Sequence, residues 1–155
     1  MSRIADRALR VVLTAAHSAL SGLWFLQRPV TYGAHSIALT PEGRIILVKL
    51  RYAPGWRLPG GGRPPHEDPV EAALRELREE IGLVSHSEAR LARDFLERVN
   101  FKRDNASLVL VRDVRYRPHR WSWEVEQLCE AQLDALPSDL SPITERWIAA
   151  VRSLL

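Results

Sequence analysis

Residues 61–83, GGRPPHEDPVEAALRELREEIGL, constrain the fold of this chain most strongly, because they specify both ends of a helix. Asp68 suits the N-cap, Pro69 suits the first helical position, and Glu71 completes a pattern like a capping box. Gly82 suits the left-handed residue that ends a helix. Between these ends, apolar residues repeat at helical spacing and predict a core-facing stripe of Val70, Ala73, Leu74, Leu77 and Ile81.

The same helix carries an acidic face beside that stripe. Glu76, Glu79 and Glu80 stand at i, i+3 and i+4, a spacing at which like charges repel. A hard divalent cation such as Mg²⁺ prefers oxygen ligands and offsets that repulsion. The glycine-rich loop before the helix offers backbone N–H groups to a phosphate. The pattern therefore favours a metal and phosphate site over a merely solvated acidic surface.

At this point the residues resemble a known family motif, the Nudix box, G-x5-E-x7-R-E-U-x-E-E-x-G-U, where U is a bulky aliphatic residue. Every spacing of the box is kept, on Gly61, Glu67, Arg75, Glu76, Leu77, Glu79, Glu80, Gly82 and Leu83. The preceding GWRLPGGG and the β-rich runs before it are also similar to the family. The resemblance thus covers residues 30 to 150.

The resemblance implies a Nudix-type α/β/α sandwich and a hydrolase that uses Mg²⁺ or Mn²⁺ to cleave a diphosphate linkage. It implies Glu76, Glu79 and Glu80 as metal ligands, with the Gly61 carbonyl as an additional one. Arg75 would orient a glutamate of the box, and Gly60 and Gly61 would meet the substrate. Such an enzyme activates a water molecule, and a glutamate accepts its proton.

Two glutamates are candidates for that general base. Glu79 is the first choice inside the box. Glu124, in WSWEVEQ, stands where many relatives carry a further acidic residue, and Glu126 shares its strand face. Trp121 and Trp123 beside it are expected to be packing residues.

Further substrate contacts are predicted at four positions outside the box. Arg51 precedes the loop and can meet phosphate, while Trp56 can stack on a base. Phe101 and Arg103 follow the box, where relatives often recognise substrate. The proline of the ADP-ribose group and the tyrosine of the diadenosine-polyphosphate group are both absent near Val99. We expect a nucleoside triphosphate or a nucleoside diphosphate joined to another group.

Two other functions remain open on the same fold. A non-catalytic nucleotide sensor would keep the fold and lose turnover. An isomerase acting on an isoprenoid diphosphate would need a cysteine near the metal, and Cys129, the only cysteine, lies late in the chain. A single cysteine also excludes an intramolecular disulfide and favours a reducing compartment, so we expect a cytoplasmic protein.

Composition limits the partners. The chain has 155 residues, of which 46% are hydrophobic and 26% charged, as in one globular domain. Its net charge of +3 is compatible with a small anionic substrate. It lacks the dense Lys/Arg stripe of dedicated nucleic-acid binders, so no nucleic acid partner is expected.

Residues 1–28 are predicted to form an amphipathic helix ahead of the main domain, residues 29–155. Its polar side steps by three or four residues through Arg3, Arg7, Arg10, Thr14, His17 and Ser21. Its uncharged run is shorter than the roughly 20 residues that span a bilayer. We expect it to pack on its own domain or on a second subunit in a homodimer, with a membrane-surface position as the alternative.

The remaining pattern is α+β, with a mixed sheet and helices packed on its faces. Residues 31–40 and 44–52 are β-rich and flank PEG at 41–43, which predicts a hairpin. Residues 87–101, 106–116 and 121–131 predict further strands. Residues 141–155 predict a C-terminal helix capped by Ser141 and opened by Pro142.

Overall fold

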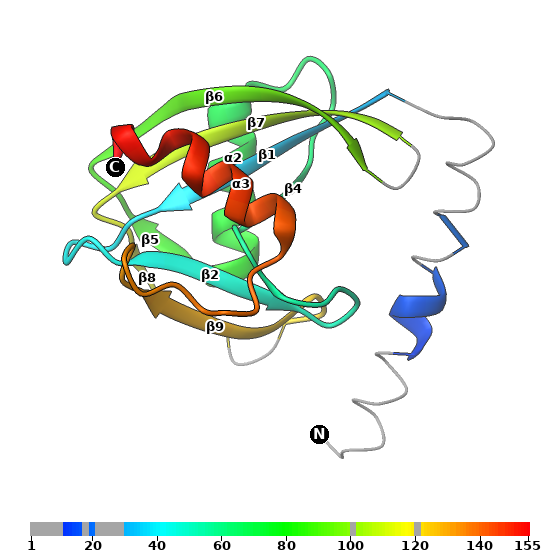
Figure 1. The fold of residues 1–155 in the computed structure, drawn as a ribbon, viewed down its shortest axis with the longest axis horizontal. Helices are drawn as coiled ribbons and strands as arrows, with labels where there is room; N and C mark the ends of the chain where they lie inside the picture. Colours follow the sequence, from blue (N-terminus) through cyan, green and yellow to red (C-terminus); the bar gives the residue numbers. More distant parts are fainter. Residues whose placement is uncertain (1–10, 17–18, 21–29, 100–101, 120–121) are drawn as a thin grey trace.

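The computed structural model describes residues 11–16, 19–20, 30–99, 102–119 and 122–155. Figure 1 shows the fold and labels most of its elements. In chain order the elements are β1 (Val30–Ala38), β2 (Ile45–Leu50), β3 (Trp56–Arg57), β4 (Gly60–Gly62), α2 (Pro69–Ile81), β5 (Leu83–Ser85), β6 (Glu88–Val99), β7 (Lys102–Arg112), β8 (Arg115–Tyr116), β9 (Val125–Ala131), α3 (Pro142–Val151) and a 3-10 turn (Arg152–Leu154). The α+β class expected from the sequence is confirmed.

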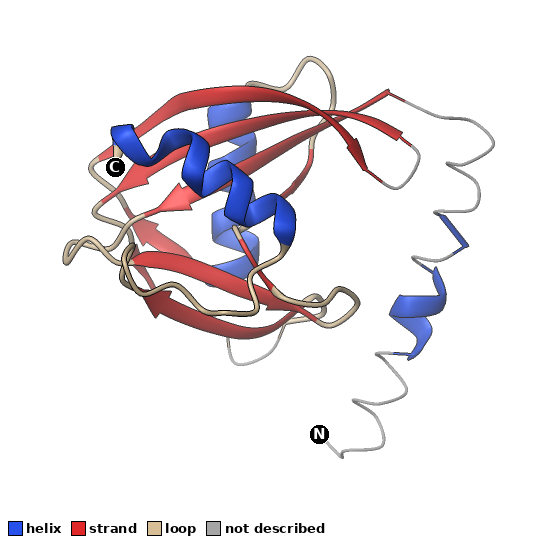
Figure 2. Cartoon of the chain, viewed as in Figure 1, coloured by secondary structure: helices blue, strands red, loops and turns tan. Residues whose placement is uncertain are grey.

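The described strands form three sheets. The largest has the order β4-β1-β7-β6 and is mixed, because β1 runs parallel to β7 while β4 and β6 run antiparallel to their neighbours. The second has the order β3-β2-β9 and is antiparallel, and β5 pairs with β8. In Figure 2, α3 crosses in front of the strands and α2 lies behind them.

The core has two layers, one under each helix. Because successive residues of a strand point to opposite faces, β1, β2 and β7 bury side chains on both. One layer joins these strands to α2 through Ala34, Ile46, Val109, Leu77 and Ile81. The other joins them to α3 through Ile37, Leu47, Leu108, Trp147 and Ile148. This arrangement is the expected α/β/α sandwich.

The predicted hairpin of residues 31–52 is only partly right. The turn forms, with Gly43 N–H donating to Thr40 O and a bridge between Leu39 and Ile45. The strands on either side then diverge into different sheets. A strand has two edges, and both edges of β1 are already paired with β4 and β7, while those of β2 are paired with β3 and β9. The sequence indicates the turn, but it does not show which strands pair with the edges of β1 and β2.

Helix α2 begins and ends where its sequence predicts. The Asp68 carboxylate accepts from the N–H groups of Val70 at 2.8 Å and Glu71 at 3.1 Å. Gly82 ends the helix at φ 73° and ψ 50°, in the left-handed region. Helix α3 is likewise capped by Ser141, whose side chain accepts from the Thr144 N–H. These caps fix the length of α2 and the direction in which its acidic face points.

Most of the predicted N-terminal helix lies outside the described residues. Within it, residues 11–16 and 19–20 are helical, and Val11, Val12 and Leu20 are exposed. No helix among the residues described here is long and apolar enough to cross a membrane. Packing of this segment on its own domain, on a second subunit or on a membrane surface stays a prediction.

The end of α2 gives a test of the fold. A Cβ on Gly82 would stand 2.1 Å from the Arg117 carbonyl oxygen, and Gly82 also has a positive φ. We expect Gly82→Ala to lower the free energy of unfolding by roughly 2–4 kcal/mol, because the clash adds to the strain of a left-handed L-residue. Urea denaturation measures this change.

Gly43 supplies the matched control. It has a similar φ of 75°, but a Cβ there meets nothing within 4 Å. Gly43→Ala should therefore show only the left-handed strain of about 1 kcal/mol. Equal losses in the two variants would contradict the proposed close contact between Gly82 and Arg117.

Candidate active site

Two adjoining cavities lie at the same end of the strands. The smaller one, the carboxylate cavity, has a volume of about 570 Å³ and is lined by Tyr52, Gly60, Gly61, Gly62, Glu76, Glu79, Glu80, Ser122, Trp123 and Glu124. The large cavity has a volume of about 910 Å³ and reaches from β1 to the start of α3. Tyr52 and the three glycines of β4 line both cavities. The two cavities therefore adjoin along β4.

Helix α2 brings its three glutamates to this cavity in different environments. Glu80 is only 8% exposed, and its carboxylate accepts from the Gly60 N–H at 2.8 Å. Glu76 is largely covered and accepts from the Arg75 guanidinium at 2.7 Å. The Glu79 side chain is 62% exposed and faces solvent. Glu124, which precedes β9, lines the same cavity.

Arg75 hydrogen-bonds both to Glu67, just before α2, and to the acidic face of α2. Its guanidinium donates to both oxygens of Glu67 at 3.2 Å and to Glu76, and it lies 3.7 Å from a Glu79 oxygen. It also donates to the Gly62 carbonyl at 3.3 Å. The hydrogen bonds from Arg75 hold the pKa of the Glu67 carboxyl below its usual range. Arg75 thus links Glu67, Glu76 and the backbone of β4 through its guanidinium.

The glycines of β4 are required by close approach. Gly60 has a φ of 145°, and a Cβ there would stand 2.3 Å from the Ala34 carbonyl oxygen. A Cβ on Gly61 would stand 2.8 Å from the Glu76 carboxylate. Residues larger than glycine would therefore push β4 away from β1 or displace Glu76. The predicted residues Gly60 and Gly61 do line both cavities.

The electrostatics of the carboxylate cavity disfavour ionisation of its buried glutamates. Burial first, together with the charges of Glu76, Glu124 and Glu79, raises the pKa of Glu80 to about 8, against the hydrogen bond from Gly60. Burial also raises the pKa of Glu76, against the hydrogen bond from Arg75. Carboxylates forced together in this way are stabilised as anions by an added cation.

The donor set matches a hard divalent cation, but the side chains are engaged elsewhere. Across the described ranges, no group of three or more His, Cys, Asp or Glu side chains is arranged so that it could hold a metal ion. Glu76 is turned onto Arg75 and Glu80 onto Gly60. The cavity therefore brings the oxygen ligands together without presenting them as a formed metal site.

The other predicted substrate residues lie away from the cavities or outside the described part. Arg51 donates to the Ser122 carbonyl at 3.4 Å and lines neither cavity. Trp56 packs against the core layer under α3. Arg103 is exposed at the start of β7, beside Asp104 of the large cavity. Phe101 lies outside the described residues.

Three residues of the carboxylate cavity were missed or misassigned from the sequence. Trp123 was expected to pack, and this was wrong, since it is 66% exposed at the mouth of the cavity. Tyr52 and Ser122 gave no motif signal. Ser122 accepts from the backbone of Val125 at 3.1 Å and so shapes the turn that presents Glu124. The WSW tripeptide just before Glu124 was the only available hint.

Comparison with known proteins identifies the family. The NUDIX domain family matches residues 30–151, and the chain belongs to this family. A MutT NUDIX hydrolase from Burkholderia pseudomallei has a similar structure, with a TM-score of 0.65 and 29% identity, over 79% of this chain and 98% of that chain. A bifunctional NMN adenylyltransferase/ADP ribose pyrophosphatase from Francisella tularensis shares the fold at 15% identity, with a TM-score of 0.67, over 92% of this chain and 48% of that chain.

Curated relatives match over a shorter stretch. A putative 8-oxo-dGTP diphosphatase from Bacillus subtilis is 48% identical over 52 residues, which are 34% of this chain and 35% of that protein. An RNA pyrophosphohydrolase from Halorhodospira halophila is 40% identical over 47 residues, which are 30% of this chain and 26% of that protein. The chain thus spans about a third or less of the length of these relatives.

The raised pKa of Glu80 predicts a pH-dependent stability. Between about pH 4.5 and 8, the native state holds a proton that the unfolded chain releases. The free energy of unfolding therefore falls as the pH rises through this window. In EDTA, we expect the wild-type melting temperature to fall between pH 5 and 8, and Glu80→Gln to flatten that dependence.

Glu71→Gln is the control for this measurement, because Glu71 is exposed on the same helix and lines neither cavity. It should keep the wild-type dependence of melting temperature on pH. A Glu80→Gln variant that loses stability with pH as steeply as wild type would show that Glu80 does not take up the proton.

Proposed function

We propose that this protein is a divalent-metal-dependent hydrolase that cleaves a diphosphate linkage in a nucleoside triphosphate or in a nucleoside diphosphate joined to another group. The observation that carries the proposal is the carboxylate cavity, where Glu76, Glu79, Glu80 and Glu124 lie together. The large cavity beside it has room for the organic part of such a substrate. The two are joined through β4, so one substrate can reach both.

The named relatives support a nucleotide substrate. One is named a putative 8-oxo-dGTP diphosphatase and the other an RNA pyrophosphohydrolase, so the first name gives a nucleoside triphosphate as substrate and the second gives RNA. The matched stretches are short, so the substrate of this chain is inferred as a class. A cytoplasmic location is consistent with such a substrate.

Glu76, Glu79 and Glu80 are the residues that would hold Mg²⁺ or Mn²⁺, with the Gly61 carbonyl as a further oxygen ligand. Carboxylate and carbonyl oxygens are the ligands these ions prefer. The raised pKa values of Glu76 and Glu80 fit this role, because burial and neighbouring negative charge favour a bound cation. When bound, the ion neutralises the diphosphate and lowers the pKa of a water molecule.

The remaining steps fall to the chain's own side chains. Glu79 is the most exposed glutamate of the helix face, so it is placed to accept the proton of the attacking water. Glu124 reaches the same cavity from β9 and is the alternative base. Arg75 holds Glu76 against rotation. The backbone of β4 forms the floor on which a diphosphate lies.

Loss of the proposed base gives the test. Glu79→Gln removes a solvent-facing carboxylate, so we expect the fold to be kept and kcat to fall roughly a hundredfold or more. The assay is a hydrolysis screen with Mg²⁺ and products identified by mass, over nucleoside triphosphates, ADP-ribose, nucleotide sugars and dinucleoside polyphosphates. EDTA should abolish turnover.

Glu71→Gln is again the matched control, and it should turn over substrate at the wild-type rate. Unchanged rates in both Glu79→Gln and Glu80→Gln would contradict the assignment of the site. Binding of nucleotides without turnover of any of them would favour the alternative function, a non-catalytic sensor on the same fold.

A further inference from the structure

Arg57, at the end of β3, is a cation of the large cavity, and it has no anionic partner among the residues that the structure describes. It lines that cavity, and its Nε is buried without a hydrogen-bond acceptor. Its closest polar contact runs from Nη2 to the Pro54 carbonyl at 3.5 Å, the outer limit for a hydrogen bond. No Asp or Glu of the described segments forms an ion pair with it.

The other two arginines of the large cavity are already engaged. Arg146 pairs with Glu97 at 3.1 Å. Arg63 donates to the Glu67 carbonyl at 2.7 Å and lies over the Tyr32 ring. The start of α3 is also occupied, because the Ser141 side chain accepts from the Thr144 N–H. The Nε of Arg63 is also buried without an acceptor, but its Nη1 is held at 2.7 Å by the Glu67 carbonyl. Among the described residues, Arg57 is therefore the arginine of this cavity that has neither an ion pair nor a short hydrogen bond.

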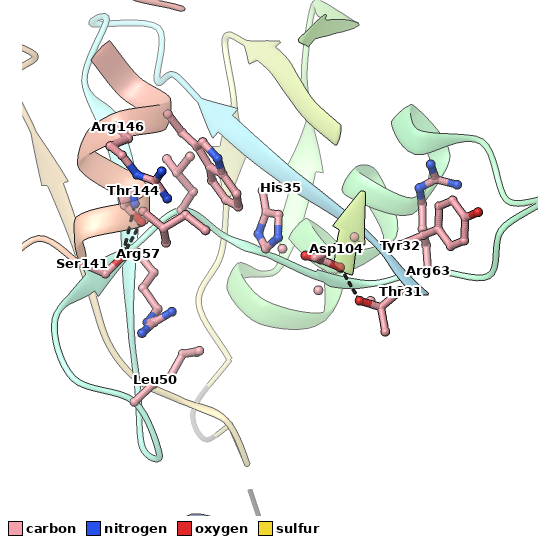
Figure 3. Close-up of a pocket in the computed structure, with 18 of the residues that line it drawn as sticks. Thr31, Tyr32, His35, Leu50, Arg57, Arg63, Asp104, Ser141, Thr144 and Arg146 are labelled. Carbon is pink, nitrogen blue, oxygen red and sulfur yellow. Dashed lines mark hydrogen bonds between the residues drawn. The ribbon is translucent and has the colours of Figure 1, made fainter. Parts of the chain in front are cut away.

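Arg57 lies near the end of the large cavity that adjoins the carboxylate cavity, and Tyr52 connects the two. Tyr52 lines both cavities, and its pKa is raised to about 12 by burial and by Glu124, Glu80 and Glu76, while Arg57 lowers it. Tyr52 thus interacts electrostatically both with the glutamates of the carboxylate cavity and with Arg57. In Figure 3, the Arg57 guanidinium points toward Leu50, and Asp104 with its partner Thr31 lies beyond His35.

An unpaired, half-buried guanidinium is unfavourable for folding, because burial removes water from donors that gain no acceptor. Burial accordingly lowers the pKa of Arg57. An arginine keeps its charge throughout the physiological range and presents fixed N–H donors that match phosphate geometry. The cost is offset once a phosphate oxygen accepts from these donors.

We propose that Arg57 binds a phosphate group of the substrate inside the large cavity, at the end that adjoins the carboxylate cavity. This inference rests on the proposed function, since it names a phosphate-binding residue for the same reaction. It assigns an orientation: the phosphate nearest the organic group lies at Arg57, and the scissile linkage lies across β4 by the glutamates. Neither the box nor its spacing identifies this residue.

Binding without turnover tests the proposal directly. The full chain is titrated in EDTA with inorganic pyrophosphate, AMP and GMP, and affinity is followed by calorimetry. We expect Arg57→Met to weaken binding at least about tenfold, since a charge-assisted hydrogen bond is lost. Arg57→Lys should lose less, because it keeps the charge without the planar fork. In the Mg²⁺ assay, Arg57→Met should raise KM more than it lowers kcat.

Arg44→Met is the control, because Arg44 is exposed on the turn before β2 and lines neither cavity. Its affinities should equal those of wild type. Thermal melting keeps the test decisive: pyrophosphate should raise the melting temperature of wild type and Arg44→Met, and raise that of Arg57→Met and Arg57→Lys less.

The proposal is overturned if folded Arg57→Met binds these anions as tightly as wild type, or if wild type binds none of them. The proposed function fails separately. If anions bind through Arg57 but no substrate is hydrolysed, the proposed hydrolase function is wrong and the proposed phosphate site is supported. If Arg57→Met shows metal-dependent hydrolysis with an unchanged KM, the proposed phosphate site at Arg57 is wrong and the proposed hydrolase function is supported.

Discussion

The contact between the glycine strand β4 and the acidic face of α2 is the interaction on which the site depends. Gly60 donates its N–H to Glu80, and Gly61 leaves room for the Glu76 carboxylate. This contact buries two carboxylates against backbone, which costs free energy. The capped ends of α2 and its apolar stripe in the core offset that cost. The fold thus holds negative charge where a solvated helix would disperse it.

The same contact brings the two cavities together along β4. Strand β4 pairs with β1 on one side and faces α2 on the other. Its backbone therefore lies beside the glutamates of α2 and also lines the large cavity. On the proposed account, a substrate that lies along β4 meets oxygen ligands for a cation and a guanidinium for a phosphate. Arg75 fixes the relation between these parts by linking Glu67, Glu76 and Gly62.

Local signals in the sequence predicted the parts of the fold that depend on local interactions. Asp68, Pro69 and Gly82 specify the ends of α2 through hydrogen bonds and φ angles within a few residues, and the structure has the helix in that place. Pairing of β1 and β2 depends on which strands compete for their edges, so the predicted hairpin was only partly right. The grouping of Glu124 with the α2 glutamates came from the resemblance, since no local pattern joins residues so far apart.

The rest of the site could not be predicted because it depends on burial. Trp123 is apolar and follows another tryptophan by two residues, as a strand core does, yet it lies exposed at the cavity mouth. Arg57 stands in a stretch of sequence rich in glycine and proline, where an arginine is ordinarily solvated. Only the packing of β3 beside β2 shows that its Nε is buried without an acceptor.

The most direct test of the account is to locate a bound cation. Crystals of the full chain soaked in Mn²⁺ give an anomalous difference map whose peaks mark the ion independently of any assay. The account predicts a peak in the carboxylate cavity within ligand distance of oxygens from Glu76, Glu79 or Glu80. A map with no peak there, or with Mn²⁺ only at other carboxylates, would contradict it.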